Sequence, residues 1–326
     1  MTTSSTRPTP GAVTERSKAF VAAHRAEAEA LGRRLADLIQ DPEEFATVLQ
    51  DGLGRLGDPE VVAGQHFVAP GLGATHGVRN PLLDAARRSF GRETRHDRPT
   101  SLLYVVDRLF REDELEVRWF AFGLLQRTLP VEPERTWQLL RRAAREAGDW
   151  ITVDTLARPY ARGIIDESYR WAELEQLVYS PSRWERRLVG STIATIPYVD
   201  RERGRTPDVV TRGLAILGML IGDAEPDVQK ALSWAYRELA RVDREATRTA
   251  LDRETGTAVN TADGHRAWVI RDSLAKLDPA VAGRLRTRLD GIRRRPGAGS
   301  SSVAAELAGR FGALPDPVVH PDPPLT

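Results

Sequence analysis

The stretch from residue 229 to residue 239 reads QKALSWAYREL, and its spacing is that of an α-helix. Lys230, Trp234 and Arg237 follow one another at intervals of four and three residues. Residues three or four apart share one face of a helix. The stretch therefore predicts an amphipathic helix with Leu232 and Leu239 turned inward and the charges outward.

The same periodicity extends along most of the chain. Apolar residues recur at three- and four-residue intervals in many segments, such as Phe45-Val48-Leu49-Leu53, Leu102-Leu103-Val106-Leu109-Phe110 and Leu214-Leu217-Leu220. Helix-punctuating residues separate these segments at Gly57-Asp58-Pro59, Arg98-Pro99, Leu129-Pro130, Pro181-Ser182, Thr206-Pro207 and Asp278-Pro279. No segment keeps the two-residue alternation of a strand, so the pattern predicts an all-α protein.

The predicted helices are short and closely spaced, which favours a repeat architecture. Helices of roughly 12–18 residues joined by short turns suit stacked antiparallel pairs. Equivalent motifs recur about every 35–50 residues, as in HEAT-like repeats. We expect a curved solenoid of antiparallel helical pairs whose concave groove accommodates an extended ligand.

The two ends of the chain differ in composition from the middle. Residues 1–12 are polar and contain Pro8 and Pro10, which predicts a disordered N-terminus. Residues 13–294 form the predicted repeat domain. Residues 295–326 are rich in Gly, Ser and Pro and predict a flexible tail, interrupted by one short amphipathic piece at Val303–Phe311.

Charge is balanced overall but unevenly distributed. The formal net charge is +1, so net charge alone does not argue for a nucleic-acid partner. Arginines crowd two stretches, Arg183, Arg186, Arg187, Arg201, Arg203, Arg205 and Arg212 in the first, and Arg284, Arg286, Arg288, Arg293, Arg294 and Arg295 in the second. A locally basic surface binds phosphates. The alternative is a set of solvated helix faces with acidic partners four residues away.

Several classes of protein are disfavoured by what the sequence lacks. It has no cysteine, which excludes disulfides, cysteine-ligated zinc and cysteine nucleophiles. The six histidines show no metal-ligand spacing, and no GxxxxGK, GxGxxG or GxSxG context occurs, so we expect no metal and no cofactor. No apolar run approaches the ~18 residues of a membrane span, and no secretory signal begins the chain. We expect a cytoplasmic protein.

Two further motifs pair a tryptophan with a charge on one helix face. Trp150 and Asp154 lie four residues apart in DWITVD, and Trp184 and Arg187 lie three apart in SRWERR. Taken singly, each tryptophan suits a core position and each charge a solvated surface. An aspartate on an apolar helix face requires a partner, however. An arginine fork beside an aromatic ring suits a phosphate.

Taken together and in this order, the three tryptophan motifs resemble the bacterial DNA alkylation-repair glycosylases built from HEAT-like repeats, the AlkD group. The resemblance covers about residues 43–278. It also includes HGVRNP at 76–81 and EVRWFA at 116–121.

The resemblance implies roles for individual residues. Asp154 matches the catalytic carboxylate of the family. Trp150 and Trp234 match aromatics that pack against the deoxyribose and backbone of the lesion nucleotide, and Arg187 matches a DNA-backbone contact. Further residues are placed near DNA by sharing these motifs, namely Trp184, Lys230, Arg237, Arg186 and Arg183.

Some positions depart from the family pattern. Asp149 and Ile151 stand where the family often has an aromatic and an acid. At the position of an N-terminal tyrosine, this chain has Gln65, His66 or Phe67. The N-terminal extension, residues 201–207 and the tail lie outside the shared core.

The implied activity is hydrolysis of the N-glycosidic bond of cationic N3- or N7-alkylated purines in duplex DNA, without a base-specific flipping pocket. Such an enzyme tolerates bulky adducts, including those of DNA-alkylating natural products, which suggests self-resistance. We expect a monomer with no membrane and no obligate protein partner. Two alternatives stay open, namely a non-catalytic protein that binds distorted or branched DNA, and a protein-interaction scaffold.

Overall fold

The computed structural model describes residues 10–69 and 71–311, and the regular elements in that part of the chain are all helical. The one β contact among these residues is an isolated bridge between Gly57 and Val78. The prediction of an all-α protein is therefore confirmed. Of the predicted disordered segment 1–12, residues 1–9 lie outside the described part, and helix α1 begins at Pro10.

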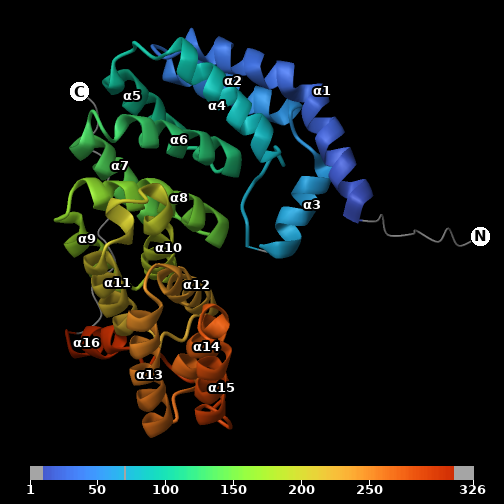
Figure 1. Ribbon diagram of the computed structural model, residues 1–326. Helices are drawn as coiled ribbons and strands as arrows, with labels where there is room; N and C mark the ends of the chain where they lie inside the picture. The colour runs from blue at the N-terminus through green and yellow to red at the C-terminus, as the bar shows by residue number, and fades with distance from the viewer. Residues whose placement is uncertain (1–9, 70, 312–326) are drawn as a thin grey trace, which may run out of the picture. The chain divides into compact units, whose positions relative to one another are not determined.

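The chain divides into two compact units, Met1–Ala143 and Ala144–Thr326, where the sequence predicts one repeat domain over residues 13–294. The helices of unit 1 are α1 (Pro10–Ala36), α2 (Pro42–Arg55), α3 (Pro59–Val68), α4 (Asn80–Glu93), α5 (Pro99–Leu109), α6 (Leu115–Thr128) and α7 (Pro133–Glu146), the last of which crosses the boundary (Figure 1). Within this unit α4 packs between α1 and α6, and α2 packs on α5.

Three phenylalanines form the centre of the unit 1 core. Phe45, Phe90 and Phe120 are buried on α2, α4 and α6, and their ring centroids lie 5.7–6.0 Å apart with edges facing rings. Such edge-to-face packing adds about 0.5–1.5 kcal/mol per pair beyond the buried area. The apolar periodicity of these helices therefore converges on one aromatic cluster.

The loop between α3 and α4 is fixed by a buried carboxylate on α6. Glu116 has no exposed surface and accepts hydrogen bonds from the backbone nitrogens of His76, Gly77 and Val78 at 2.9, 2.9 and 3.1 Å. The hydroxyl of Thr75 donates to the same carboxylate at 2.8 Å. Gly77 has a φ of +72°, a conformation that favours glycine. The HGV part of the 76–81 motif is thus a structural anchor.

Unit 2 contains the helices that carry the three tryptophan motifs. Its helices are α8 (Trp150–Asp166), α9 (Arg170–Gln176), η1 (Leu177–Tyr179), α10 (Arg183–Val199), η2 (Arg203–Arg205), α11 (Pro207–Leu220), α12 (Pro226–Val242), α13 (Arg244–Thr261), α14 (Gly264–Ser273), η3 (Leu274–Lys276), α15 (Pro279–Arg288) and α16 (Val303–Phe311).

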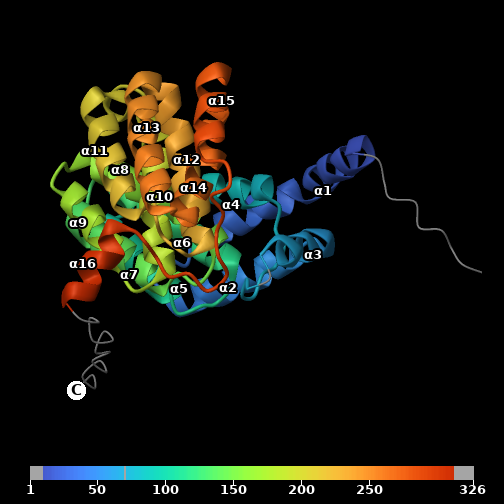
Figure 2. The same cartoon turned by 90° about the horizontal axis from the view of Figure 1, so that it is seen from below.

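The helices of unit 2 form two layers, as repeated helical pairs do. In one layer α10 packs between α8 and α12, and α12 packs on α14. In the other layer α13 packs between α11 and α15 (Figure 2). Successive helices alternate between the layers, because α11 also contacts α12 and α13 contacts α14. The three tryptophan motifs all belong to the first layer.

Helix starts agree with the sequence signals. The side chains of Asp41, Asp58, Thr206 and Asp278 each accept a hydrogen bond from a backbone N–H in the first turn of the helix that follows. Proline occupies the first turn of the same four helices, where its missing N–H is not needed. None of the helices in the described ranges is long and apolar enough to cross a membrane.

The segment that follows α15 is packed against unit 2 over part of its length. The backbone N–H of Ser301 donates to the carbonyl of Gly222 at 2.8 Å, and its hydroxyl donates to Asp263 at 2.5 Å. Ser302 and Ala304 are buried, and α16 spans the amphipathic piece predicted from sequence. Packing therefore continues past residue 294, where the sequence predicts a flexible tail to begin, because serine groups here pair with the loops between helices.

Helices α10 and α12 approach each other so closely at Gly190 that a larger residue there should destabilise unit 2. A Cβ added at Gly190 on α10 would lie 2.8–2.9 Å from the backbone of Ala231 and Leu232 on α12. We expect Gly190→Ala to lower the free energy of unfolding by about 1–3 kcal/mol, since the helices must separate. Gly283→Ala on α15 is the matched control, because its Cβ would meet nothing within 4 Å. It should stabilise the protein by up to about 1 kcal/mol. Denaturant unfolding measures both; equal effects would contradict the close approach.

Candidate functional site

Helix α8 presents one tryptophan and one aspartate on a single face. The helix starts at Trp150 because the side chain of Asp149 caps it, accepting from the Thr152 backbone N–H at 2.8 Å and the Thr152 hydroxyl at 2.6 Å. Asp149 is therefore the N-cap of α8, at the position where the family that the sequence resembles often has an aromatic residue. One turn further, the side chain of Asp154 is 24% exposed. Arg158, one more turn along, is exposed.

A bidentate ion pair joins α8 to α10. Nε of Arg187 lies 3.1 Å from Oδ1 of Asp154, and Nη2 lies 2.8 Å from Oδ2. The third nitrogen, Nη1, donates to the backbone carbonyl of Asp227 on α12 at 2.7 Å. The Arg187 side chain is only 6% exposed, and its guanidinium carbon lies 5.6 Å from the ring centroid of Trp150. Every guanidinium nitrogen therefore has an acceptor within the protein.

A serine completes the surroundings of the carboxylate. The Ser191 hydroxyl donates to Oδ1 of Asp154 at 2.6 Å, and the Ser191 side chain is fully buried. Sequence reasoning missed this residue, although it lies four residues after Arg187 and so shares its helix face. Asp154 accepts three hydrogen bonds from α10, which fix the orientation of its carboxylate while part of it stays open to solvent.

Helix α12 contributes an aromatic and two cations. Trp234 is half-buried. Lys230 is exposed, and its ammonium group has no hydrogen-bond or ion-pair partner among the residues the structure describes. Arg237 donates through Nη1 to the Asp272 carboxylate at 2.7 Å. The helix brings Trp234 into the same layer as Asp154, since α10 packs against both α8 and α12.

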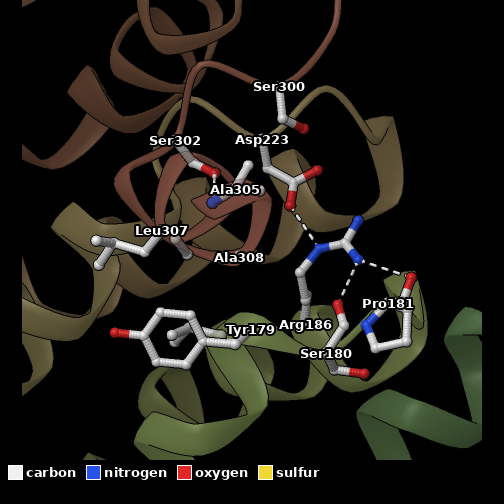
Figure 3. Close-up of a pocket in the computed structure, with 13 residues that line it drawn as sticks. Tyr179, Ser180, Pro181, Arg186, Asp223, Ser300, Ser302, Ala305, Leu307 and Ala308 are labelled. Atoms are coloured by element: carbon white, nitrogen blue, oxygen red, sulfur yellow. Dashed lines mark hydrogen bonds and ion pairs between the residues drawn. The ribbon is translucent and has the colours of Figure 1, made fainter. Parts of the chain in front are cut away.

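The arginines at the start of α10 have different surroundings. Arg183 is exposed and stacks over Trp184, with 4.6 Å between its guanidinium carbon and the ring centroid. Arg186 is half-buried and pairs with the buried Asp223 at 2.7 Å, and it also donates to the carbonyls of Ser180 and Pro181 at 2.8 and 2.9 Å (Figure 3). Arg186 therefore holds a loop, whereas Arg183 is exposed and lies 3.6 Å from one exposed carboxylate, that of Glu225.

The pocket in Figure 3 lies apart from the carboxylate. It has a volume of about 680 Å³ and is lined mainly by apolar residues of η1 and α16, together with Arg186 and Asp223. Asp154, Trp150 and Trp234 do not line it. Within the described ranges, no group of three or more His, Asp or Glu side chains is arranged to hold a metal ion.

In unit 1, the three residues predicted to stand at the position of the family's N-terminal tyrosine lie on α3. The side-chain oxygen of Gln65 lies 2.7 Å from the Thr75 hydroxyl oxygen, which ties Gln65 to the loop. His66 is exposed, and Phe67 is 85% exposed. Phe67 thus presents a phenyl ring to solvent.

The side chains gathered in unit 2 can stabilise a positive charge that develops on a sugar. An oriented carboxylate stabilises a developing positive charge next to it, and a half-buried indole offers a π face to a sugar. Exposed cations at Arg158, Arg183 and Lys230 suit phosphates.

Comparison with known protein families gives a match. The model of the family described as "DNA alkylation repair enzyme" matches residues 49–277. These residues include all three tryptophan motifs. A comparison with curated proteins found no match.

The structural role of Arg186 is testable. Arg186→Ala leaves the buried Asp223 without its cation, so we expect a loss of about 3 kcal/mol or more of unfolding free energy. Arg183→Ala is the matched control on the same helix turn. Its nearest carboxylate, that of Glu225, lies 3.6 Å away and both side chains are exposed, so stability should stay within about 0.5 kcal/mol. Thermal or denaturant unfolding measures both variants. A stable Arg186→Ala variant would show that this arginine is available for a ligand.

Proposed function

Because the chain belongs to the DNA alkylation repair enzyme family, we propose that it is a DNA glycosylase that hydrolyses the N-glycosidic bond of alkylated purines in duplex DNA. Family membership supports a role in the repair of alkylated DNA. The observation that carries the finer proposal is the Asp154 carboxylate, oriented by Arg187 and Ser191 beside Trp150.

The chemistry follows from the charge of the lesion. An N3- or N7-alkylated purine is cationic, so the base leaves with the electrons of the C1′–N bond and becomes neutral. Positive charge then develops on the sugar, and Asp154 stabilises this oxocarbenium-like state. Water adds to C1′, and its proton passes to Asp154 or to solvent, which completes hydrolysis.

The remaining residues bind and position the substrate. Trp150 and Trp234 pack against the deoxyribose and backbone of the lesion nucleotide. Arg187 positions Asp154, because its three nitrogens are engaged within the protein. Lys230 and Arg183, which are exposed, contact phosphates.

The enzyme works from the backbone side and has no need of a pocket shaped to one base. A half-buried indole on the same helix face as an oriented carboxylate recognises a sugar, which is common to all nucleotides. The base can then stay within the duplex while its bond to the sugar is cut. The substrate range therefore includes bulky purine adducts, among them those of DNA-alkylating natural products, and the enzyme gives self-resistance where such compounds are made.

The role of Asp154 is tested by base release from alkylated duplex DNA. We expect wild-type protein to release modified purine and Asp154→Asn to be slower by about 10²–10³-fold, the usual loss when one charge-stabilising group is removed. Asp166→Asn is the control, because Asp166 lies on the same helix and pairs instead with Arg162 and Arg203. It should keep activity.

Binding to the same DNA, measured in parallel, separates the alternatives. Tight binding without release by wild-type protein would favour a non-catalytic protein that recognises damaged DNA. Neither binding nor release would favour a protein-interaction scaffold. Equal release by wild-type and Asp154→Asn protein would remove Asp154 from the mechanism.

The lesion range is tested with two duplexes that differ in one purine adduct, a methyl group in one and a bulky group in the other. We expect release from both, with rates within about one order of magnitude, since recognition depends on the sugar and on the charge of the base rather than on its size. Abasic-site cleavage gels measure both rates. Release of the methylated purine alone would contradict a mechanism that leaves the base unenclosed.

A further inference from the structure

A second tryptophan–aspartate pair with the spacing of Trp150 and Asp154 lies on helix α14. Trp268 and Asp272 are four residues apart in WVIRD, where α8 has WITVD. The two carboxylates also have the same kinds of neighbour, one serine and one arginine from an adjacent helix of the same layer. For Asp272 these are Ser233 and Arg237 on α12.

Asp272 contacts only one of the three guanidinium nitrogens of Arg237, namely Nη1. Oδ2 of Asp272 accepts from the Ser233 hydroxyl at 2.6 Å and from Nη1 of Arg237 at 2.7 Å. The same Nη1 donates to the Asp272 backbone carbonyl at 2.9 Å and lies 3.3 Å from the Ser233 hydroxyl oxygen. One nitrogen of Arg237 is thus held by three acceptors.

The other edge of this arginine has no partner within the described residues. Nε and Nη2 of Arg237 make no hydrogen bond there, in contrast to Arg187, all of whose nitrogens are engaged. An arginine fixed at one nitrogen and open along its remaining edge presents two parallel donors, the geometry that matches two phosphate oxygens.

We propose that Asp272 is a positioning residue that orients Arg237 toward a phosphate of the DNA backbone. The inference rests on the proposed function for DNA as the substrate. Lys230 lies seven residues before Arg237, two turns along the same face of α12, and is exposed. Arg294 lies over the ring of Trp268, with its guanidinium carbon 4.9 Å from the centroid, and it donates to the side chain of Gln229.

The sign of one mutational effect distinguishes positioning from simple electrostatics. Asp272 is 46% exposed, so removing its negative charge makes the surface more basic, which by itself tightens DNA binding. If Asp272 holds Arg237 in place, its removal frees the arginine to adopt many rotamers and weakens binding instead. The two explanations therefore predict opposite changes in affinity.

The experiment measures binding of a short undamaged duplex at several salt concentrations by the full-length chain and its variants. We expect Arg237→Ala to reduce the slope of log affinity against log salt by about one, the loss of one phosphate contact. We expect Asp272→Ala to weaken binding several-fold and to lower the slope in the same direction. The double variant should bind no more weakly than Arg237→Ala, because the two residues act as one unit.

A matched control comes from another ion pair of unit 2. Asp252 is 51% exposed and accepts from Nη1 of Arg288 at 2.5 Å, so Asp252→Ala removes an equivalent charge from an equivalent pair. It should leave DNA affinity unchanged or slightly raised. Circular dichroism and thermal midpoints check that each variant is folded. Asp272→Asn, which keeps an oxygen acceptor for Arg237, should retain more affinity than Asp272→Ala.

Tighter or unchanged binding by a folded Asp272→Ala variant would overturn the inference and leave the glycosylase proposal standing. Additive losses in the double variant would do the same. If the wild-type protein binds neither this duplex nor the alkylated duplex, the proposed function itself fails, and the positioning role fails with it.

Discussion

One buried cation ties together the three helices on which the candidate site depends. Arg187 lies on α10 and donates hydrogen bonds to the Asp154 carboxylate on α8 and to the backbone carbonyl of Asp227 on α12. A buried charge left without partners costs several kcal/mol, so the burial of Arg187 depends on these contacts. The pair therefore fixes the register of the three helices, and their register decides where the tryptophans lie.

Local signals account for most of the fold. Aspartate or threonine before proline predicts where helices begin, and the apolar spacing predicts which faces are buried. Even the short helix α16, predicted within a segment otherwise rich in glycine and serine, forms at Val303–Phe311. These features depend on neighbours three or four residues away, which a single sequence contains. The contacts of Ser301 in the same segment are with Gly222 and Asp263, which are distant in sequence, and no local pattern indicates them.

The site is predictable only in part, for the same reason. The spacing of Trp150 and Asp154 predicts a shared face, but the identity of the partner that holds the carboxylate depends on α10 and Ser191, 37 residues away. Arg186 and Arg187 are adjacent in sequence and indistinguishable by composition. One pairs with Asp223 and supports a loop, while the other pairs with Asp154. Helix packing, rather than spacing along the chain, decides which arginine meets which acid.

The pairing of Asp154 with Arg187 raises the question of how a neutralised carboxylate stabilises a cation. The relative exposure of the two groups gives an answer. Asp154 is 24% exposed and Arg187 only 6%, so a ligand arriving from solvent meets the carboxylate before the guanidinium. Coulomb attraction falls with distance, and the nearer charge dominates at the sugar. Under the proposed function, a nucleotide places an anionic phosphate next to the sugar that becomes cationic, and a carboxylate with exposed cations on neighbouring helices matches both. Under the proposed chemistry, Arg187 keeps Asp154 oriented before the charge develops, so little reorganisation is needed when it does.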